Sequence, residues 1–248
     1  MAIAAHWMIS DNFGDRLTPW LIENIRGERP TWVSQTFDAE YYVASGSILN
    51  LANEHAKVWG AGLASFNDNV NDRAQIYAVR GPLTRAKALA SRAKCPAVYG
   101  DPAILLPMFL PKKIEKIHDI GLIPHYVDQF RVFSRYPGVM KLNVFDPIEI
   151  FIDQVKSCRR IVSSALHGII VAHAFGIPAA WVRWGDSIGG DSMKYFDHFA
   201  AVGLDVPYPV DRRDNSDDVQ LDAFQCPDPS HMENLRKQLW NACPFRRS

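Results

Sequence analysis

The segment that decides the fold class is residues 161–182, which read IVSSALHGIIVAHAFGIPAAWV. It contains no Asp, Glu, Lys or Arg over a length that could in principle cross a bilayer. Its polar residues and its Gly-Ile-Pro break divide it, however, into a strand ending near Val162, a helix over residues 166–175, a turn, and a strand over residues 179–184. This order is typical of a buried unit in a soluble α/β core, so we expect no transmembrane segment.

The rest of the chain repeats the same alternation of short apolar runs and helical patterns. Further strands are predicted at residues 40–44, 56–59, 75–79, 97–99, 120–124 and 141–144, and the strand that ends near Val162 begins at residue 160. Helical patterns cover residues 17–25, 82–93 and 147–157. The alternation predicts an α/β fold with parallel strands, right-handed crossovers and helices on both faces of the sheet.

A candidate domain boundary follows the last strand pattern of the first half. Pro107 and Pro111 are followed by Lys112, Lys113 and Lys116, a composition that suits an exposed connection. We therefore expect two small doubly wound domains, residues 1–108 and 116–225. Residues 226–248 are expected to add a helix over 231–240, packed in a remaining apolar groove, and a tail.

Composition limits the classes of protein and of partner. The 248 residues are 48% hydrophobic and 22% charged, which excludes a disordered, collagen-like or coiled-coil chain. Lys plus Arg and Asp plus Glu each number 27, so charge gives no reason to expect a nucleic-acid partner. The four cysteines form no CxxC pair and the N-terminus resembles no signal peptide, so we expect reduced thiols in a cytoplasmic protein.

Ligands of open α/β sheets bind beyond the carboxyl ends of the strands, so the loops there are the first candidates for a site. One such loop contains Gly46 and Ser47, and the next contains Gly62. Neither reads as GxGxxG or as a P-loop, which excludes a dinucleotide or ATP fingerprint. Taken alone, each loop is better explained as a structural turn than as a binding loop.

The segment Arg80-Gly81-Pro82 joins a predicted strand to a predicted helix. Pro82 suits the first helical position, and Arg80 would lie beside the free N–H groups and the positive end of the helix dipole. Arg85 follows on the same helix. Two interpretations stay open for Arg80: a cradle for a ligand phosphate or carboxylate, and a pair with a structural carboxylate.

Two acidic positions precede predicted helical turns. Asp101, between Gly100 and Pro102, could cap the following turn, orient a sugar hydroxyl or act as a base. The run from Asn12 to Asp15 precedes the first helix, where Asn and Asp are favoured caps.

The strongest candidate site is the helix start at residues 163–168. Two hydroxyls, of Ser163 and Ser164, and the His167 imidazole lie where free N–H groups favour an anion. A histidine there can donate to phosphate or act as a general acid. His173, six residues later, is turned by about 600° and so cannot share a metal with His167. With no HExxH motif and no acidic cluster, we expect no metal.

These segments, in this order, resemble the polysaccharide pyruvyl transferase family, and most closely its succinoglycan-type, ketal-forming subgroup. The resemblance covers residues 10 to 200. It rests on residues 12–15, 46–48, 59–62, 80–82, 100–102, 123–126, 163–168 and 194–197, of which Arg80-Gly-Pro, Gly-Asp101-Pro and Leu166-His167-Gly are the most specific.

The resemblance implies a fold and an activity. The fold would be two Rossmann-like domains facing a cleft, as in two-domain (GT-B-type) glycosyltransferases, with the acceptor on the N-terminal side and the donor on the C-terminal side. The activity would move the enolpyruvyl group of phosphoenolpyruvate onto two hydroxyls of a sugar in an exopolysaccharide or cell-surface glycan, giving a ketal and phosphate. The acceptor would be a sugar or a lipid-linked oligosaccharide, with peripheral membrane association left open, and no cofactor is expected.

Residue roles follow from the motifs and the resemblance together. His167 is the expected catalytic acid, with Asp101 or His125 as the base. Many family members have an arginine before the Leu-His-Gly element, where this chain has Ala165, so Arg80, Arg85 or Lys194 is expected to supply the cation. The expected substrate-binding residues are Asn12, Gly14, Asp15, Gly46, Ser47, Gly62, Arg80, Arg85, Ser163, Ser164, Leu166, Gly168 and Lys194.

Two other functions remain open from the sequence. A sugar-nucleotide glycosyltransferase of similar architecture would place its donor diphosphate at the same helix start. A non-catalytic carbohydrate-binding relative would keep the fold without the reaction.

Overall fold

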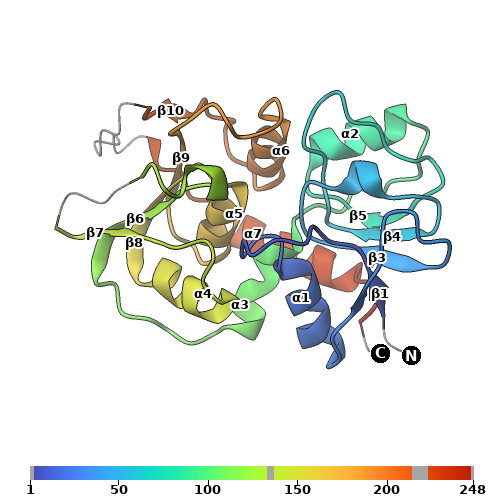
Figure 1. The fold of residues 1–248 in the computed structure, drawn as a ribbon, viewed down its shortest axis with the longest axis horizontal. Helices are drawn as coiled ribbons and strands as arrows, with labels where there is room; N and C mark the ends of the chain where they lie inside the picture. Colours follow the sequence, from blue (N-terminus) through green and yellow to red (C-terminus); the bar gives the residue numbers. More distant parts are fainter. Residues whose placement is uncertain (1–2, 133–136, 214–222, 247–248) are drawn as a thin grey trace.

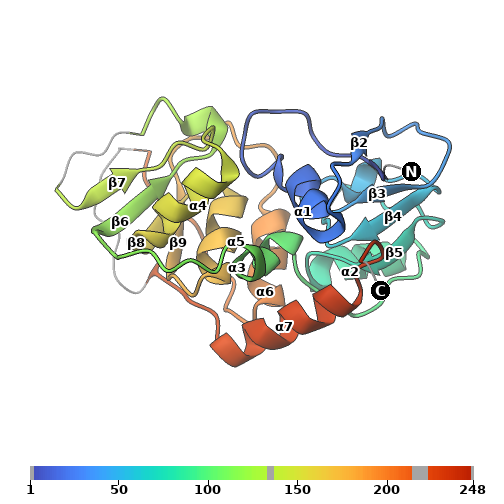
Figure 2. The same cartoon turned by 90° about the horizontal axis from the view of Figure 1, so that it is seen from below.

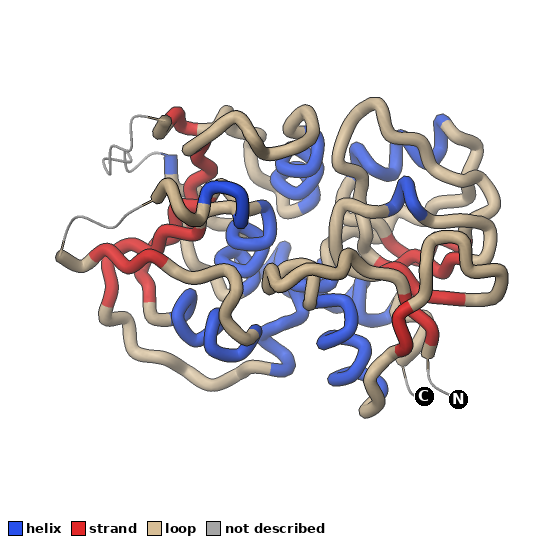
Figure 3. Tube along the Cα trace, in the orientation of Figure 1, coloured by secondary structure: helices blue, strands red, loops and turns tan. Residues whose placement is uncertain are grey.

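The strands of the computed structural model form two groups, one on each side of the molecule (Figure 3). The structure describes residues 3–132, 137–213 and 223–246. The first sheet has the order β2-β1-β3-β4-β5, made of β1 (Ala4–Ala5), β2 (Thr31–Trp32), β3 (Tyr41–Val43), β4 (Ala56–Trp59) and β5 (Gln75–Ala78). The second has the order β10-β9-β8-β6-β7, made of β6 (His118–Ile123), β7 (Val139–Lys141), β8 (Cys158–Ser163), β9 (Ala179–Arg183) and β10 (Val210–Asp211).

The strands within each sheet pair in parallel, and helices connect many of them (Figure 1). The helices are α1 (Leu17–Arg26), α2 (Pro82–Ala90), α3 (Leu106–Phe109), α4 (Ile148–Lys156), α5 (Leu166–Ala174), α6 (Met193–Ala201) and α7 (Pro229–Asn241). The predicted α/β class is therefore confirmed. The two-residue strands β1, β2 and β10 are too short to give a sequence signal, and residues 97–99 contribute only an isolated bridge between Tyr99 and Val79.

The segment at residues 161–182 folds as its breaks predict. It forms the end of β8, the whole of α5, a turn in which Gly176 has a positive φ of 66°, and most of β9. Glycine fits that turn because it adopts the left-handed conformation without a steric penalty. Within the described residues, none of the helices is long and apolar enough to cross a membrane.

Helices cover both faces of the first sheet, because successive side chains of a strand point to opposite faces. Val43 and Val58 belong to a buried cluster that includes Ala88 of α2. Trp59, next to Val58, belongs instead to the cluster that contains Leu21 of α1. The predicted two-sided arrangement is observed here.

The second sheet is covered differently on its two faces. Ile161 packs in one cluster with Phe151 of α4 and Ile169 of α5, and both helices contact β8. The neighbouring Val162 faces a smaller cluster that a loop side chain, Val132, helps to close. The expectation of helices on both faces is therefore met by the first sheet, whereas loop residues contribute the cover here.

Helix α7 runs beneath both halves of the molecule (Figure 2). It buries Met232, Leu235 and Leu239. The carbonyl of Leu239 accepts a hydrogen bond from Trp59 Nε1 in β4 at 2.9 Å. The Arg236 guanidinium donates to the carbonyl of Ile104 at 3.0 Å and to the carbonyl of Ala174 at the end of α5. The last helix thus ties the two sheets together.

Candidate active site

A pocket of about 350 Å³ lies where the loops after strands of both sheets meet. Ser47 follows β3 of the first sheet, whereas His125 follows β6 and His167 follows β8 of the second. Lys194 of α6 completes the wall. The volume is within the usual range for small-molecule sites, roughly 300–1,000 Å³. The pocket therefore lies at the strand ends where an α/β protein is expected to bind its ligand.

His167 and Asp101 form a pair across the junction of the two halves. The side chain of His167, in the first turn of α5, is 13% exposed, and its Nε2 lies 3.5 Å from Oδ2 of the buried Asp101. The same Nε2 lies 3.1 Å from Oγ of Ser45, which donates to Asp101 Oδ1 at 2.8 Å. The carboxylate thus fixes the direction of the imidazole from behind.

The surroundings of Asp101 favour its charged form. Burial alone raises the pKa of this carboxyl, but the hydrogen bond and charge of His167, with further hydrogen bonds from Ala103 N–H and Ser45 Oγ, outweigh burial and hold the pKa below its ordinary value. The backbone N–H of Gly46 also donates to Oδ2 at 3.2 Å. Asp101 does cap the following turn, as one sequence interpretation proposed, since it accepts from Ala103 N–H at 3.0 Å. Its position outside the pocket lining suits orientation of His167 better than direct proton abstraction.

Gly14 leaves the space that Nδ1 of the His167 ring occupies. A Cβ at residue 14 would overlap Nδ1 and Cγ of His167. Phe13, next to it, stacks on Phe151 of α4 with a ring-centroid distance of 3.8 Å and donates its N–H to Val144 O at 2.8 Å. The segment around Gly14 is thus anchored to the second half of the molecule, and glycine lets it approach the imidazole.

His125 lines the pocket in a neutral form. Burial, reinforced by the charges of Lys194 and His167, lowers its pKa to about 4. Its backbone N–H donates to Ser164 Oγ at 2.9 Å, which fixes the loop after β6. An imidazole that is uncharged at neutral pH can accept a proton, so His125 has the protonation state that a base requires.

Lys194 is the one of the three expected cations that lines the pocket. Burial, assisted by the charge of Arg80, lowers its pKa to about 8, while the charge of Asp15 opposes the shift. The ammonium group is therefore largely charged at neutral pH. It faces the same cavity as Leu166 and His167, the first two residues of α5, whose N–H groups precede the first hydrogen bonds of the helix, those of Gly168 and Ile169 to Ala165 O.

Arg80 lies behind the pocket wall, fully buried. Its Nε donates to Asp197 Oδ2 of α6 at 3.1 Å, and its Nη2 donates to Leu63 O at 2.5 Å. Its Nη1 donates to Ser47 Oγ at 2.8 Å. Of the two interpretations that the sequence left open, the structure favours the pair with a structural carboxylate, and Arg80 reaches the pocket only through Ser47.

Gly62, Arg85 and Gly168, like Gly14, also lie outside the lining. Gly62 makes room for Arg80, because a Cβ there would overlap the guanidinium. Arg85 donates its Nε to Cys95 O at 3.2 Å, away from the pocket. Gly168 packs against Ser163 and Ile123, where a Cβ would overlap the serine hydroxyl. These positions support the site instead of forming its surface.

The two serines at the start of α5 bond within the protein. Both are fully buried. Ser163 Oγ lies 2.8 Å from Ile123 O and accepts from Ala165 N–H at 3.0 Å. Ser164 Oγ donates to Asp128 Oδ2 at 3.2 Å. Their hydroxyls therefore hold the β8–α5 turn, and the surface of this helix start is made by Ala165, Leu166 and His167.

Most of the remaining expected residues lie in the pocket, and sequence reasoning missed several neighbours. Asn12, Asp15, Gly46 and Leu166, all expected to bind substrate, line it. The lining residues that were not singled out are Met8, Phe13, Ile48, Asn50, Leu51, Ala64, Tyr126 and Ala165. Helix α6 was missed as an element, although Met193, Phe196 and Phe199 have helical spacing. Among the described residues, no group of His, Cys, Asp or Glu is placed to hold a metal ion.

Together, the fold and the pocket define an α/β protein with two parallel sheets and an anion-favouring site that carries two histidines. The sequence model of the polysaccharide pyruvyl transferase family matches residues 58–187, more than half of the chain. The chain belongs to this family, and the resemblance stated from its motifs is confirmed.

Two relatives illustrate the similarity. An uncharacterized protein of Acanthamoeba polyphaga mimivirus is 30% identical over 221 residues, covering 82% of this chain and 75% of the relative. The succinoglycan biosynthesis protein ExoV of Rhizobium meliloti is 28% identical over 211 residues, covering 78% of this chain and 62% of ExoV, less than two thirds of its length. No solved structure matches the chain significantly.

Proposed function

We propose that this transferase moves the enolpyruvyl group of phosphoenolpyruvate onto two hydroxyls of one sugar in an exopolysaccharide or cell-surface glycan. The observation that carries the proposal is the convergence of Lys194, the start of α5 and two histidines on one pocket, in a chain of the pyruvyl transferase family. An anionic donor suits the lysine and the helix N-terminus, and the histidines suit proton transfer.

The donor is held by charge. The phosphate and carboxylate of phosphoenolpyruvate bind to Lys194 and to the first-turn N–H groups of α5, which also stabilise the departing phosphate. Ser47, held by Arg80, adds a hydroxyl at the pocket wall. Lys194 thus takes the place of the arginine that many family members carry before the Leu-His-Gly element.

The proton transfers are assigned to the two histidines. His167, oriented by Asp101, donates a proton to the methylene carbon of the enol, which becomes the ketal methyl group. His125 accepts the proton of the first sugar hydroxyl as that oxygen bonds to C2. The C2–O bond to phosphate breaks, the second hydroxyl bonds to C2, and its proton leaves with phosphate. One phosphate is released for each ketal formed.

We further infer the arrangement that the family resemblance implies. Residues 1–108 form the acceptor-side domain, residues 116–225 the donor-side domain, and residues 226–248 the final helix and tail, as in two-domain (GT-B-type) glycosyltransferases. The four cysteines are free in the structure, which supports a cytoplasmic site of action.

Ligand-induced thermal stabilisation tests the donor. Phosphoenolpyruvate should raise the melting temperature in a concentration-dependent way, since a ligand that binds only the folded state stabilises it. In the presence of a sugar acceptor, phosphate release should follow. Stabilisation by a sugar nucleotide, with none by phosphoenolpyruvate, would instead identify a glycosyltransferase.

A further inference from the structure

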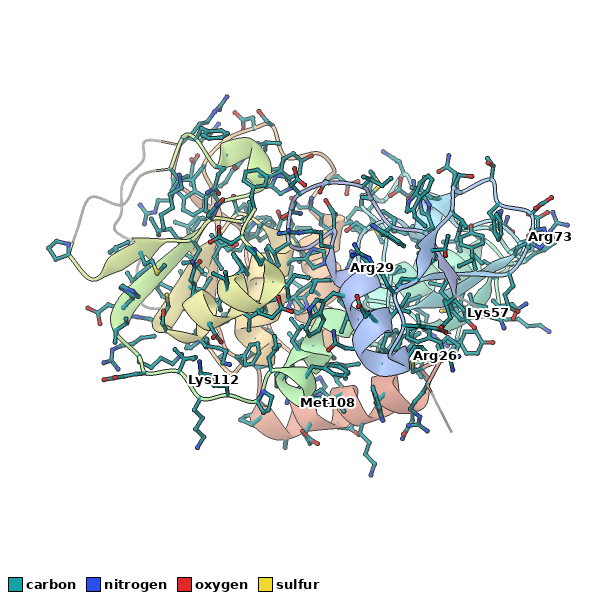
Figure 4. The ribbon with its side chains drawn as sticks, turned by 60° about the horizontal axis from the view of Figure 1, so that its bottom comes forward. Arg26, Arg29, Lys57, Arg73, Met108 and Lys112 are labelled. Atoms are coloured by element: carbon teal, nitrogen blue, oxygen red, sulfur yellow. The ribbon has the colours of Figure 1, made fainter. Side chains whose placement is uncertain are left out.

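A second cavity, of about 490 Å³, lies next to the catalytic pocket and has no role in the reaction described above. Three tryptophans face it, together with two arginines and two glutamates: Trp7, Trp20, Trp32, Arg16, Arg29, Glu23 and Glu149. We call it the tryptophan groove. Trp20 and Glu23 come from α1, Trp32 from β2 and Glu149 from the first turn of α4. Arg29 is labelled beside α1 in Figure 4.

The groove and the catalytic pocket share one wall, the segment at residues 7–16. Met8, Asn12 and Asp15 of this segment line the catalytic pocket. Trp7 and Ile9, on either side of Met8, line the tryptophan groove. Alternate side chains of an extended segment point in opposite directions, so one short stretch of backbone separates the two cavities. A ligand that occupies both cavities must therefore be long enough to cross this stretch of backbone.

Hydrogen bonds fix the orientation of two of the three indole rings. Trp20 Nε1 donates to Glu149 Oε1 at 2.6 Å, and Trp32 Nε1 donates to Trp7 O at 3.0 Å. Trp32 remains 40% exposed, so its ring is accessible to a ligand. An indole whose N–H is already bonded offers mainly an apolar surface, which matches the C–H face of a sugar ring.

The polar groups of the groove match the rest of a sugar. Its two arginines and two glutamates balance in charge, which favours a neutral ligand over a second anion. Carboxylates accept hydrogen bonds from sugar hydroxyls, and guanidinium groups donate hydrogen bonds to the hydroxyl oxygens. Aromatic surfaces with a few polar groups at the edge are typical of sites for small polar molecules.

We propose that the tryptophan groove is a subsite for neutral saccharide units of the acceptor glycan, next to the unit that receives the pyruvyl group. This inference rests on the proposed function for the identity of the acceptor. It predicts that the enzyme distinguishes acceptors by length, because only an acceptor of two or more units reaches both cavities.

Binding of neutral gluco- and galacto-oligosaccharides of one to four units tests the subsite without any turnover. The indole N–H signals of Trp7, Trp20 and Trp32 should shift with the longer sugars in NMR spectra of the ¹⁵N-labelled protein. Trp32→Ala should weaken this binding about tenfold, as expected for an aromatic anchor. Tyr208→Ala, which removes an aromatic side chain that is 87% exposed and outside both cavities, is the matched control.

The outcomes separate this inference from the proposed function. Stabilisation by phosphoenolpyruvate should be the same in Trp32→Ala as in the wild type, while the KM for an acceptor of two or more units rises about tenfold. A wild-type acceptor KM in this variant, or indole signals that no oligosaccharide moves, overturns the subsite and leaves the transfer reaction intact. Indole signals that move with inorganic phosphate or phosphoenolpyruvate would identify an anion site and also overturn it.

Discussion

The starts of helices α2 and α5 have similar sequence features but different surroundings in the structure. Each follows a strand, carries donor groups and was expected to bind an anion. At α2, the anion is the protein's own Asp197: Oδ1 accepts from the N–H groups of Leu83 at 2.8 Å and Thr84 at 3.0 Å. At α5, the first turn faces the open pocket with His167 and Lys194.

The difference shows that an anion-favouring helix start does not specify which anion it binds. Helix α6 decides the matter at both places, since it directs Asp197 to α2 and Lys194, one turn earlier, to the pocket beside α5. Helix α6 thus supplies the anion that occupies the start of α2 and the cation that lies beside the start of α5.

The largest expected effect is at the start of α2, which Asp197 occupies. Asp197→Ala should lower the free energy of unfolding by about 3–5 kcal/mol, because it leaves the Arg80 charge buried without a partner. Urea denaturation measures this. Asp186→Ala, which removes the exposed ion pairs with Arg183 and Arg213, should change stability by less than about 1 kcal/mol. If Asp197→Ala left stability unchanged and weakened phosphoenolpyruvate binding, Arg80 would be a ligand-binding residue and not the partner of a structural carboxylate.

At the start of α5, which faces the pocket, a substitution is expected to reduce turnover. His167→Asn keeps a side chain of similar size that cannot titrate, and should reduce turnover by about 100-fold or more. Phosphate release with phosphoenolpyruvate and an acceptor measures it. The exposed His55→Asn is the control and should keep wild-type turnover. Wild-type turnover in His167→Asn would leave His167 only a structural or binding role.

Lys194→Met should weaken phosphoenolpyruvate binding by about 1.5–3 kcal/mol, the range for a hydrogen bond to a charged group. Calorimetric titration measures this, with Lys237→Met on the exposed side of α7 as control.

Because the pKa of Lys194 is lowered to about 8, the wild-type affinity should be full well below pH 8 and fall as the pH rises through that value. A pH profile that Lys194→Met leaves unchanged would contradict this role.

A matched pair of glycines separates the two helix starts by their effects. Gly14→Ala displaces the His167 ring and should lower kcat roughly tenfold or more, because misplaced catalytic groups lose rate steeply. Gly62→Ala crowds Arg80 instead and should cost about 1–3 kcal/mol of stability. Thermal unfolding and kcat, measured on both variants, should show opposite patterns. The same pattern in both would mean that the two starts are not functionally distinct.

The smallest expected effect is that of a chelator. In the proposed reaction, Lys194 and the N–H groups of α5 neutralise the departing phosphate, so ketal formation should persist in excess EDTA. Phosphate release with and without EDTA measures this. Loss of activity that added magnesium or manganese restores would overturn the metal-free reaction and favour the glycosyltransferase alternative.

The sequence by itself determined the α/β class, the core helices and the segments that contribute to the site. Strand and helix periodicity and the Gly and Pro breaks are local signals, so the fold of residues 161–182 could be predicted from its own composition. The strand-end rule likewise predicts that Gly46 and Ser47 lie at the ligand-binding edge of the first sheet and that His125 and His167 lie at the corresponding edge of the second.

Only the tertiary structure decided which charged groups line the pocket. The partner of Arg80, Asp197, lies 117 residues away in the chain, and no local pattern joins them. The same holds for the tryptophan groove, whose side chains come from β2, α1 and α4. Burial and pairing depend on which distant elements pack together, because the cost of an unpaired buried charge is set by its surroundings and not by its neighbours in sequence.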